Sequence, residues 1–370
     1  MTAIKANGPH DTNGTNGDLA QTKGSGPMAP PPSFTIQVED DSQEKLLQDI
    51  PGVHTRPLWT QMNVLVPPRP KPKAIAHKWE YEALRPHLVR AGQLVPEEQA
   101  ERRVLMLINP TMESPYTTDT LYAGLQLVLP GETAPAHRHT AFAVRFIIEG
   151  NGGFTAVQGK RIKMTRGDFI LTPTWCYHDH GNDGVAAPMI WLDGLDLPQF
   201  QHFPVHFAQH YSAPRYPAED APSSTILFPW AEMEPRLEGD PETHAVVRYT
   251  SKEEGKEGEE VSPRLGAQCE RLSPGAKSRV IRETTSAVYH VIDGRGRSVI
   301  GDKVIDWIKG DTFSVPSWEP YHHETRETQG RALTPPPQAD DKTFLFRFDD
   351  RPMIKALNFY RIGEDFLNDP

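Results

Sequence analysis

The sequence contains one pattern twice, and this internal repeat constrains the fold more than any other feature. The segment LSPGAKSRVIRETTSAVYHVIDG lies 144 residues after LPGETAPAHRHTAFAVRFIIEG, so that Gly275 matches Gly131 and Gly294 matches Gly150. The segment KGDTFSVPSWEPYHH lies 143 residues after RGDFILTPTWCYHDH. A chain of 370 residues is also longer than one ordinary domain. We therefore predict two copies of one domain, joined by a connector.

The spacing of apolar residues predicts that each copy is an all-β domain. Between Leu121 and Asp193, short apolar runs alternate with turns marked by glycine or proline: LYAGLQLVL, AVRFII, GGFTAV, DFILT and PMIWLD. Short strands at such spacing are typical of an antiparallel β-barrel or jelly roll. We expect peripheral helices over 42–50, over 79–91 and near the C-terminus.

Histidines gather in the first copy. His137 and His139 are two residues apart, so an extended strand places both side chains on one face. His178 and His180 follow a second predicted strand. Three imidazoles from neighbouring strands suit a first-row transition metal better than magnesium or calcium, which prefer oxygen. A lone pair of histidines is more often solvated or structural. The same holds for His202, His206 and His210, whose spacing predicts a helix face rather than a metal site.

A frame of turn residues around the histidines favours a metal site over solvated or structural histidines. The frame consists of Gly131, His137, His139, Gly150, Gly167, Pro173, His178 and Asn182. It resembles the two signature motifs of the cupin superfamily, which implies a metal at His137, His139 and His178. The glutamate usual in that pattern is replaced by Ala143. A site of three histidines leaves about three positions open on an octahedral ion, enough for a chelating substrate and dioxygen. The missing glutamate argues against the oxalate-oxidising cupins.

The second copy has kept the glycines of this frame and lost the ligands. Ile281 replaces His137, Glu283 replaces His139 and Tyr321 replaces His178. His322 and His323 are neighbours and must face opposite sides of a strand. We predict a degenerate second barrel without a metal.

Longer stretches resemble one enzyme family within the cupins. ERRVLMLINP, LYAGLQ, LTPTWCYHDHGND, WLDGLD and LFRFDDRPMIKAL are similar to segments of the bicupin gentisate and salicylate 1,2-dioxygenases. The resemblance implies one Fe(II) per chain, an aromatic hydroxy-carboxylate and O2 as substrates, and a homotetramer. The ring would be cleaved between its carboxyl-bearing and hydroxyl-bearing carbons, giving maleylpyruvate from gentisate. Alternatives are salicylate or 1-hydroxy-2-naphthoate as substrate, another metallo-cupin reaction, or a non-catalytic metal-binding bicupin.

Candidate residues around the metal come partly from chemistry and partly from this resemblance. Arg145 is a cation inside an apolar strand, so an anion must meet it. That anion would be the substrate or, alternatively, an internal acid such as Asp193. The resemblance adds Arg102 and His180 as substrate contacts, with His180 placed to hydrogen-bond the substrate hydroxyl or accept its proton. The alternative for His180 is a structural turn histidine. Asp193 would orient the histidine or the arginine, as carboxylates behind a site do. The resemblance also places Tyr122 where relatives often carry tryptophan, and Gly124 on the same face.

Composition excludes several other functions. The net charge of −10 gives no support for binding nucleic acid or an anionic membrane. Two cysteines, no apolar signal core and no long apolar run predict a cytoplasmic protein. We expect a disordered tail over 1–33, an N-terminal arm with helices over 34–100 and the metal-binding barrel over 101–198. A connector with an acidic loop follows over 199–262, then the degenerate barrel over 263–352 and a helix over 353–370.

Overall fold

The computed structural model describes residues 42–184, 186–325 and 342–363, so the tail predicted over 1–33 lies outside it. The chain divides into one unit that ends at Val66 and another that begins at Pro67. The described part of the first unit contains the helices α1 (Gln43–Asp49) and α2 (Met62–Leu65) and two 3-10 turns, Ile50–Val53 and Leu58–Thr60. The Ser42 hydroxyl accepts a hydrogen bond from the Lys45 amide and caps α1, as the sequence predicted.

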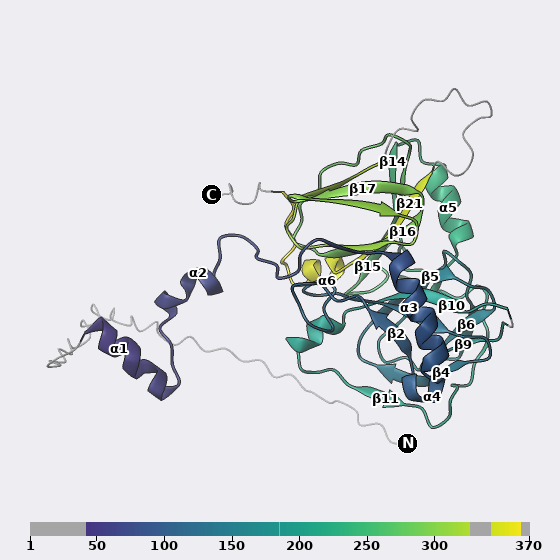
Figure 1. Cartoon of the computed structure of the whole chain (residues 1–370), viewed down its shortest axis with the longest axis horizontal. Helices are drawn as coiled ribbons and strands as arrows, with labels where there is room; N and C mark the ends of the chain where they lie inside the picture. The colour runs from purple at the N-terminus through teal and green to yellow at the C-terminus, as the bar shows by residue number, and fades with distance from the viewer. Residues whose placement is uncertain (1–41, 185, 326–341, 364–370) are drawn as a thin grey trace, which may run out of the picture. The chain divides into compact units, whose positions relative to one another are not determined.

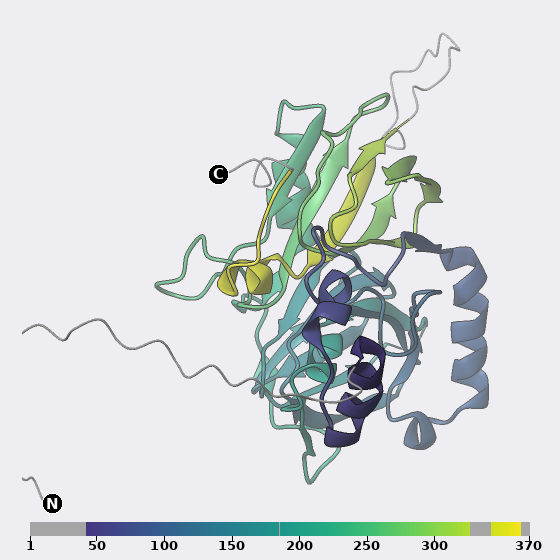
Figure 2. The same cartoon turned by 90° about the vertical axis from the view of Figure 1, so that its left-hand side faces the viewer.

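The second unit contains two β-barrels, shown mainly in blue to teal and mainly in green to yellow in Figures 1 and 2. The first barrel consists of two sheets with strand orders β13-β8-β5-β10-β3-β2 and β11-β4-β9-β6-β7-β12. Its strands are β2 (Arg103–Met106), β3 (Tyr122–Val128), β4 (Thr133–His139), β5 (Ala143–Glu149), β6 (Gly153–Val157), β7 (Lys160–Lys163), β8 (Phe169–Thr172), β9 (His178–Asn182), β10 (Met189–Leu195), β11 (Ala208–His210), β12 (Glu219–Asp220) and β13 (Leu227–Phe228).

The second barrel repeats this arrangement with sheets ordered β1-β19-β16-β21-β15-β14 and β18-β17-β20. Its strands are β1 (His77–Trp79), β14 (His244–Arg248), β15 (Gly266–Leu272), β16 (Ala287–Asp293), β17 (Arg295–Ile300), β18 (Lys303–Ile308), β19 (Thr312–Val315), β20 (Tyr321–Glu324) and β21 (Thr343–Asp349). Even the register repeats: in the first barrel Asp193 lies between its strand partners Arg145 and Gly124, and in the second barrel Arg347 lies between its strand partners Tyr289 and Gln268. The all-β bicupin fold predicted from the repeat is confirmed.

The arm and the connector both contribute strands to the barrels. β1, from the arm, pairs with β19 of the second barrel. β11, β12 and β13 come from the connector and join the first barrel, while β14 joins the second. The helix predicted from the spacing of His202, His206 and His210 is wrong, because the 3-10 turn Leu197–Gln201 ends before it and His210 lies in β11. The acidic loop 252–259 is exposed, as expected.

Helices lie outside the barrels. α3 (Tyr81–Leu94) packs on β2 and β3 and is followed by α4 (Glu97–Ala100); α5 (Trp230–Glu238) packs on β14 and β15. The C-terminal helix expected over 353–370 differs from α6 (Arg351–Ala356). Asn358, with a φ of 59°, turns the chain out of the helix. Ile362 then bridges to Glu283, and residues 364–370 lie outside the described part.

Aromatic rings join the two barrels into one core. Phe146 of β5 stacks on Phe346 of β21, with ring centroids 4.4 Å apart, and Phe169 and Tyr249 pack beside them. All four side chains are buried. Replacing such a ring by alanine costs about 3–5 kcal/mol, so each barrel stabilises the other.

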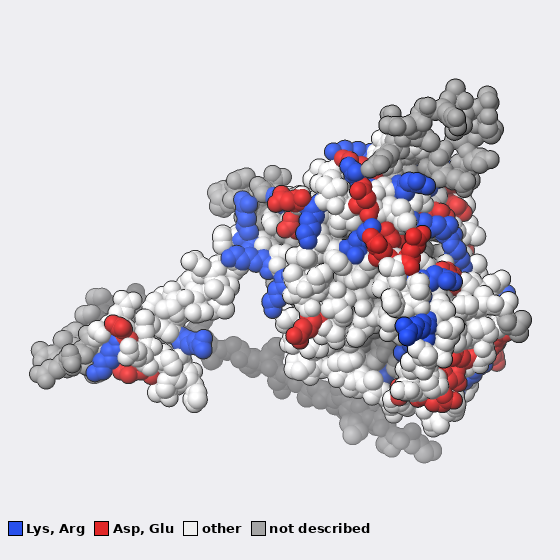
Figure 3. All heavy atoms as spheres, in the orientation of Figure 1, with Lys and Arg blue, Asp and Glu red and all other residues white. Residues whose placement is uncertain are grey.

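The surface carries charges of both signs. On the face shown in Figure 3, basic and acidic side chains are interspersed. Among the described residues, no helix has the length and apolar character needed to cross a membrane.

Candidate metal centre

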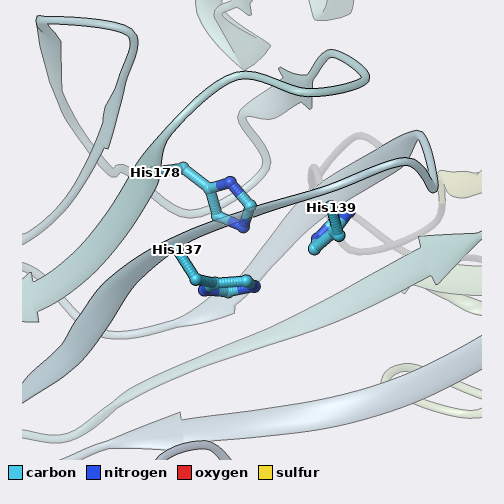
Figure 4. A group of neighbouring side chains, drawn as sticks. All are labelled: His137, His139 and His178. Atoms are coloured by element: carbon cyan, nitrogen blue, oxygen red, sulfur yellow. The ribbon is translucent and has the colours of Figure 1, made fainter. Parts of the chain in front are cut away.

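Three histidines of the first barrel converge on one point. His137 and His139 lie at the end of β4, and His178 begins β9, directly opposite His137 in the strand pairing. A register shift between Ala134 and His137 bends β4 where the ligands begin. The ligand nitrogens all lie within 4.8 Å of one another, and Figure 4 shows the rings turned toward each other. Sequence analysis therefore identified a group that can hold one metal ion.

Backbone carbonyls fix how these rings present themselves. The Nδ1 atoms of His139 and His178 lie 2.9 Å from the carbonyl oxygens of Ala141 and Cys176, and Nδ1 of His137 lies 3.5 Å from that of Pro135. A ring that donates its Nδ1 proton to a carbonyl keeps Nε2 free as the ligand atom. His139 and His178 share this geometry, which suits a metal bound through Nε2, whereas Nδ1 of His137 also contacts the guanidinium of Arg102, a group that only donates.

The surroundings keep the three imidazoles neutral. Burial, with Arg102 beside it, lowers the pKa of His137 to about 2. Burial also lowers the pKa of His139 to about 4 and holds the pKa of His178 well below its ordinary value. Neutral imidazole is the form that binds a metal. Three neutral nitrogen donors without a carboxylate fit a divalent first-row metal rather than magnesium or calcium.

Arg145 lies on the barrel interior in a buried polar cluster. Its guanidinium is 2.9 Å from the Asp193 carboxylate, 3.1 Å from the Thr155 hydroxyl and within 3.1–3.2 Å of both ring nitrogens of His180. The internal pair with Asp193, weighed as the alternative to a substrate contact, is therefore present. Burial lowers the pKa of Arg145 and raises that of Asp193, and each charge opposes the effect on the other.

His180 is held as a neutral ring beside this pair. Burial and the charge of Arg145 keep its pKa well below the ordinary value. Its Nδ1 lies 2.8 Å from the Thr155 hydroxyl, directly across the β6–β9 pairing. Because guanidinium nitrogens only donate, Nε2 accepts from Arg145 and Nδ1 donates to Thr155.

Arg102 is the second cation at the site and has a different environment. It donates to the Pro135 carbonyl at 2.9 Å and contacts Nδ1 of His137, with no hydrogen bond or ion pair to an acid among the described residues. Burial and the charge of Arg145 lower its pKa to about 10. Its neighbour Arg103 turns away and pairs with Glu132 at 2.7 Å. A partly buried cation without a carboxylate is a strong anion site.

β3 forms a wall of the same interior. Tyr122 and Gly124 lie on one face of β3, and a Cβ at Gly124 would lie 2.6 Å from the Tyr122 hydroxyl. Gln126, next on that face, is buried, and its Nε2 has no hydrogen-bond partner in the described part of the chain. Sequence analysis missed Gln126 and Thr155. The signal available in the sequence was a polar residue inside an apolar strand. Gln126 lies two residues after Gly124 and therefore on the same strand face, and Thr155 lies in the strand that pairs with His180.

Two further titratable side chains take no part in the metal group. Glu149 ends β5 and pairs with Arg85 and Tyr81. Cys176 is half-buried, and burial raises the pKa of its thiol, which gives no sign of a nucleophile. Among the described residues, His137, His139 and His178 form the one group of this kind, and the absence of a metal from the second barrel stays a prediction.

The fold and the histidine group define a bicupin metalloprotein. A profile of the cupin domain matches residues 124–194. The chain is 37% identical over 82% of its length to gentisate 1,2-dioxygenase 1 from Aquipseudomonas alcaligenes, of which 91% is covered. It is 31% identical over 90% of its length to 5-aminosalicylate 1,2-dioxygenase from Comamonas sp, of which 92% is covered.

A solved structure supports the same assignment. Salicylate 1,2-dioxygenase from Pseudoaminobacter salicylatoxidans, as an adduct with gentisate, matches with a TM-score of 0.77 and 32% identity, covering 88% of this chain and 95% of that one. The chain belongs to the gentisate 1,2-dioxygenase family of ring-cleaving oxidoreductases, which incorporate both atoms of O2.

Proposed function

We propose that this protein is an Fe(II)-dependent gentisate 1,2-dioxygenase that cleaves the ring between its carboxyl-bearing and hydroxyl-bearing carbons, giving maleylpyruvate. The observation that carries the proposal is the placement of Arg102, a partly buried cation without an acidic partner among the described residues, in contact with His137 of the metal group. An anionic substrate that approaches the metal meets this charge. The homotetramer expected from the family belongs to the same proposal.

Different residues bind the substrate carboxylate and the metal. Arg102 binds the carboxylate of the substrate, since the charge of Arg145 is already balanced by Asp193. His137, His139 and His178 would hold the ferrous ion, which supplies the electron transfer between an electron-rich ring and dioxygen. Holding both reactants next to each other in a dry barrel contributes the proximity effect.

His180 and Arg145 act on the hydroxyl side of the ring. The neutral His180 ring is oriented by Thr155, and its Nε2 accepts a hydrogen bond from the substrate hydroxyl in exchange for the one from Arg145. Arg145 then stabilises negative charge that develops on that oxygen. Asp193 keeps Arg145 in position and also accepts a hydrogen bond from the Trp191 indole at 2.8 Å.

A second candidate substrate class follows from the β3 wall. Tyr122, where relatives often carry tryptophan, is the smaller side chain and brings a hydroxyl to the interior. Salicylate or 1-hydroxy-2-naphthoate would use the same carboxylate and hydroxyl contacts with a different ring outline. Family relatives include a 1-hydroxy-2-naphthoate dioxygenase from Nocardioides sp., 31% identical over 81% of this chain.

Oxygen uptake tests the proposal. Protein loaded anaerobically with Fe(II) is mixed with gentisate, salicylate or 1-hydroxy-2-naphthoate, and dioxygen consumption is followed together with the ultraviolet band of each product. We expect the highest kcat/KM with gentisate and one O2 consumed per ring. Highest kcat/KM with another acid would assign that substrate instead, and no uptake with any of them would contradict the proposal.

Variants of Arg102 test the carboxylate contact. Arg102→Met should raise KM for gentisate by about 100-fold, the loss of roughly one charge-assisted pair, and Arg102→Lys should restore part of it. The matched control is Arg295→Met, an exposed arginine of the second barrel. Equal KM values in all variants would assign the carboxylate to another residue.

A further inference from the structure

The second barrel carries a cleft of its own. It has a volume of about 830 Å3 and is lined on its apolar side by Val246, Val280, Ile281 and Ile362, with His244 and Arg279 beside them. A volume in this range accommodates a molecule of one to three rings. Hereafter we call these six residues the second-barrel cleft.

The internal repeat shows what this position corresponds to. Ile281 occupies the place of His137 and faces Tyr321, as His137 faces His178. Val246 pairs with Glu270 of β15, as Val104 pairs with Gln126 of β3. His244, two residues before Val246, therefore corresponds to Arg102. The second-barrel cleft is the counterpart of the approach to the metal centre in the first barrel.

The inner end of the cleft is closed. Behind Ile281, the Tyr321 hydroxyl accepts from Arg347 at 2.7 Å, and Arg347 also pairs with Glu283 at 2.7 Å. These side chains are buried and fill the space that the metal ligands occupy in the first barrel. His244 is fixed at the base by the Glu270 carboxylate, 2.7 Å from its Nε2. A ligand can enter the cleft but reaches no reactive group, so the cleft is suited to binding.

The outer part combines apolar and basic groups. Val246, Val280 and Ile362 are 41%, 63% and 60% exposed, an unusual concentration of bare apolar side chains around one hollow. Three basic side chains, Lys277, Arg279 and Arg282, lie at the rim with one acid, Glu242. Lys277 is paired with Glu324 at 2.9 Å, whereas Arg279 has no ion-pair partner among the described residues. Apolar walls with more cations than acids around them are complementary to an apolar molecule that carries a negative charge.

We propose that the second-barrel cleft binds a small anionic amphiphile, an aromatic carboxylate of one or two rings, at a site separate from the metal centre. The rings lie against Val246, Val280 and Ile362, and the carboxylate pairs with Arg279. The site needs no metal and takes no part in ring cleavage.

Equilibrium titration with 2-naphthoate tests the proposal. In iron-loaded protein under anaerobic conditions, calorimetry should show a binding event that persists in His178→Ala, in which the metal centre is lost. Val280→Asp and Arg279→Glu should each weaken that event at least tenfold, while turnover of the substrate at the metal centre is unchanged. Matched controls are Val304→Asp and Lys163→Glu, exposed residues that lie outside the cleft and should change the affinity less than twofold.

Several outcomes would overturn the proposal. Loss of all binding in His178→Ala would place the ligand at the metal centre. Equal affinity for 2-naphthamide would remove the role of the charge. Tighter binding by a chain ending at Gly363 would mean that residues 364–370, which include Glu364 and Asp365, occupy the cleft. Binding that weakens as protein concentration rises would mean that a second copy covers it.

Discussion

The two barrels have the same strand register and use their interiors in opposite ways. In the first, three neutral imidazoles face a space next to Arg102 and Arg145. In the second, the counterpart of His139 is Glu283, whose carboxylate pairs with Arg347 at 2.7 Å and Arg351 at 3.0 Å. The first interior presents three neutral nitrogen donors that can hold a metal, whereas the second interior is occupied by ion pairs between its own side chains. The comparison shows that, where the second barrel lacks the histidine ligands, its interior contains charges that compensate one another.

One contact is common to both interiors. His180 lies 2.8 Å from the Thr155 hydroxyl, and its counterpart His323 lies 2.7 Å from the Ser298 hydroxyl. In the second barrel, the Trp307 indole also donates to Ser298, and Nε2 of His323 has no hydrogen-bond partner among the residues that the structure describes. The histidine–hydroxyl pair therefore belongs to the shared fold, and the guanidinium on His180 is specific to the first barrel.

The largest effect is expected when the first barrel is made like the second. His178→Tyr copies Tyr321, removes one of three ligands and should reduce bound iron from one per chain to below about a tenth. Turnover should fall by at least about 1,000-fold, because the metal reaction is lost. Elemental analysis and oxygen uptake measure both. Tyr321→His is the reciprocal variant. Binding of a second iron by this variant would contradict the claim that the second interior can no longer hold a metal.

The next effect concerns stability of the second barrel. Glu283→Gln leaves Arg347 and Arg351 buried with one anion fewer, which should lower the free energy of unfolding by about 3–5 kcal/mol. Denaturant titration measures this loss, and turnover per folded chain should not change. If kcat falls while stability is kept, the second interior takes part in the reaction.

The pH dependence of stability tests one carboxyl group of the second interior, that of Glu270. Burial alone would raise the pKa of Glu270, but the hydrogen bond with His244 and nearby positive charge lower it to about 2. A carboxyl with a lowered folded pKa stabilises above its unfolded value and loses that contribution as pH falls toward 2.

The free energy of unfolding of the wild-type protein should therefore exceed that of Glu270→Gln by up to about 3 kcal/mol near pH 6, since one pKa unit corresponds to about 1.4 kcal/mol. The difference should shrink progressively below pH 4.5. Glu242→Gln, an exposed carboxyl, is the control. A difference that is independent of pH would refute the assignment.

The smallest effect is expected on the β3 wall. Gly124→Ala places a Cβ 2.6 Å from the Tyr122 hydroxyl and 2.7 Å from Cγ1 of Val104, so Tyr122 must move. KM for gentisate should rise about tenfold, or about 1.4 kcal/mol, with iron content unchanged. Gly52→Ala, where nothing lies within 4 Å, should have no effect. An unchanged KM in Gly124→Ala would mean that this wall does not contact the substrate.

Sequence predicted most of the fold because the repeat and the histidine frame are local patterns. Gly131, Gly150 and their counterparts mark turns, and the His-x-His spacing alone places two ligands on one face. The C-terminal helix was overextended because apolar spacing does not reveal the left-handed turn at Asn358. The charge balance of Arg145, Arg102 and Asp193 depended on which side chains meet across β5, β10 and β2, and local pattern carries no such information.

The central claim is that one barrel binds the metal and the other has replaced it. A crystal of the iron-loaded protein, measured on both sides of the iron absorption edge, tests this directly. The account predicts one anomalous peak per chain, bonded to Nε2 of His137, His139 and His178, and none in the second barrel. A peak beside Glu283 and His323, or no peak at the three histidines, would contradict it.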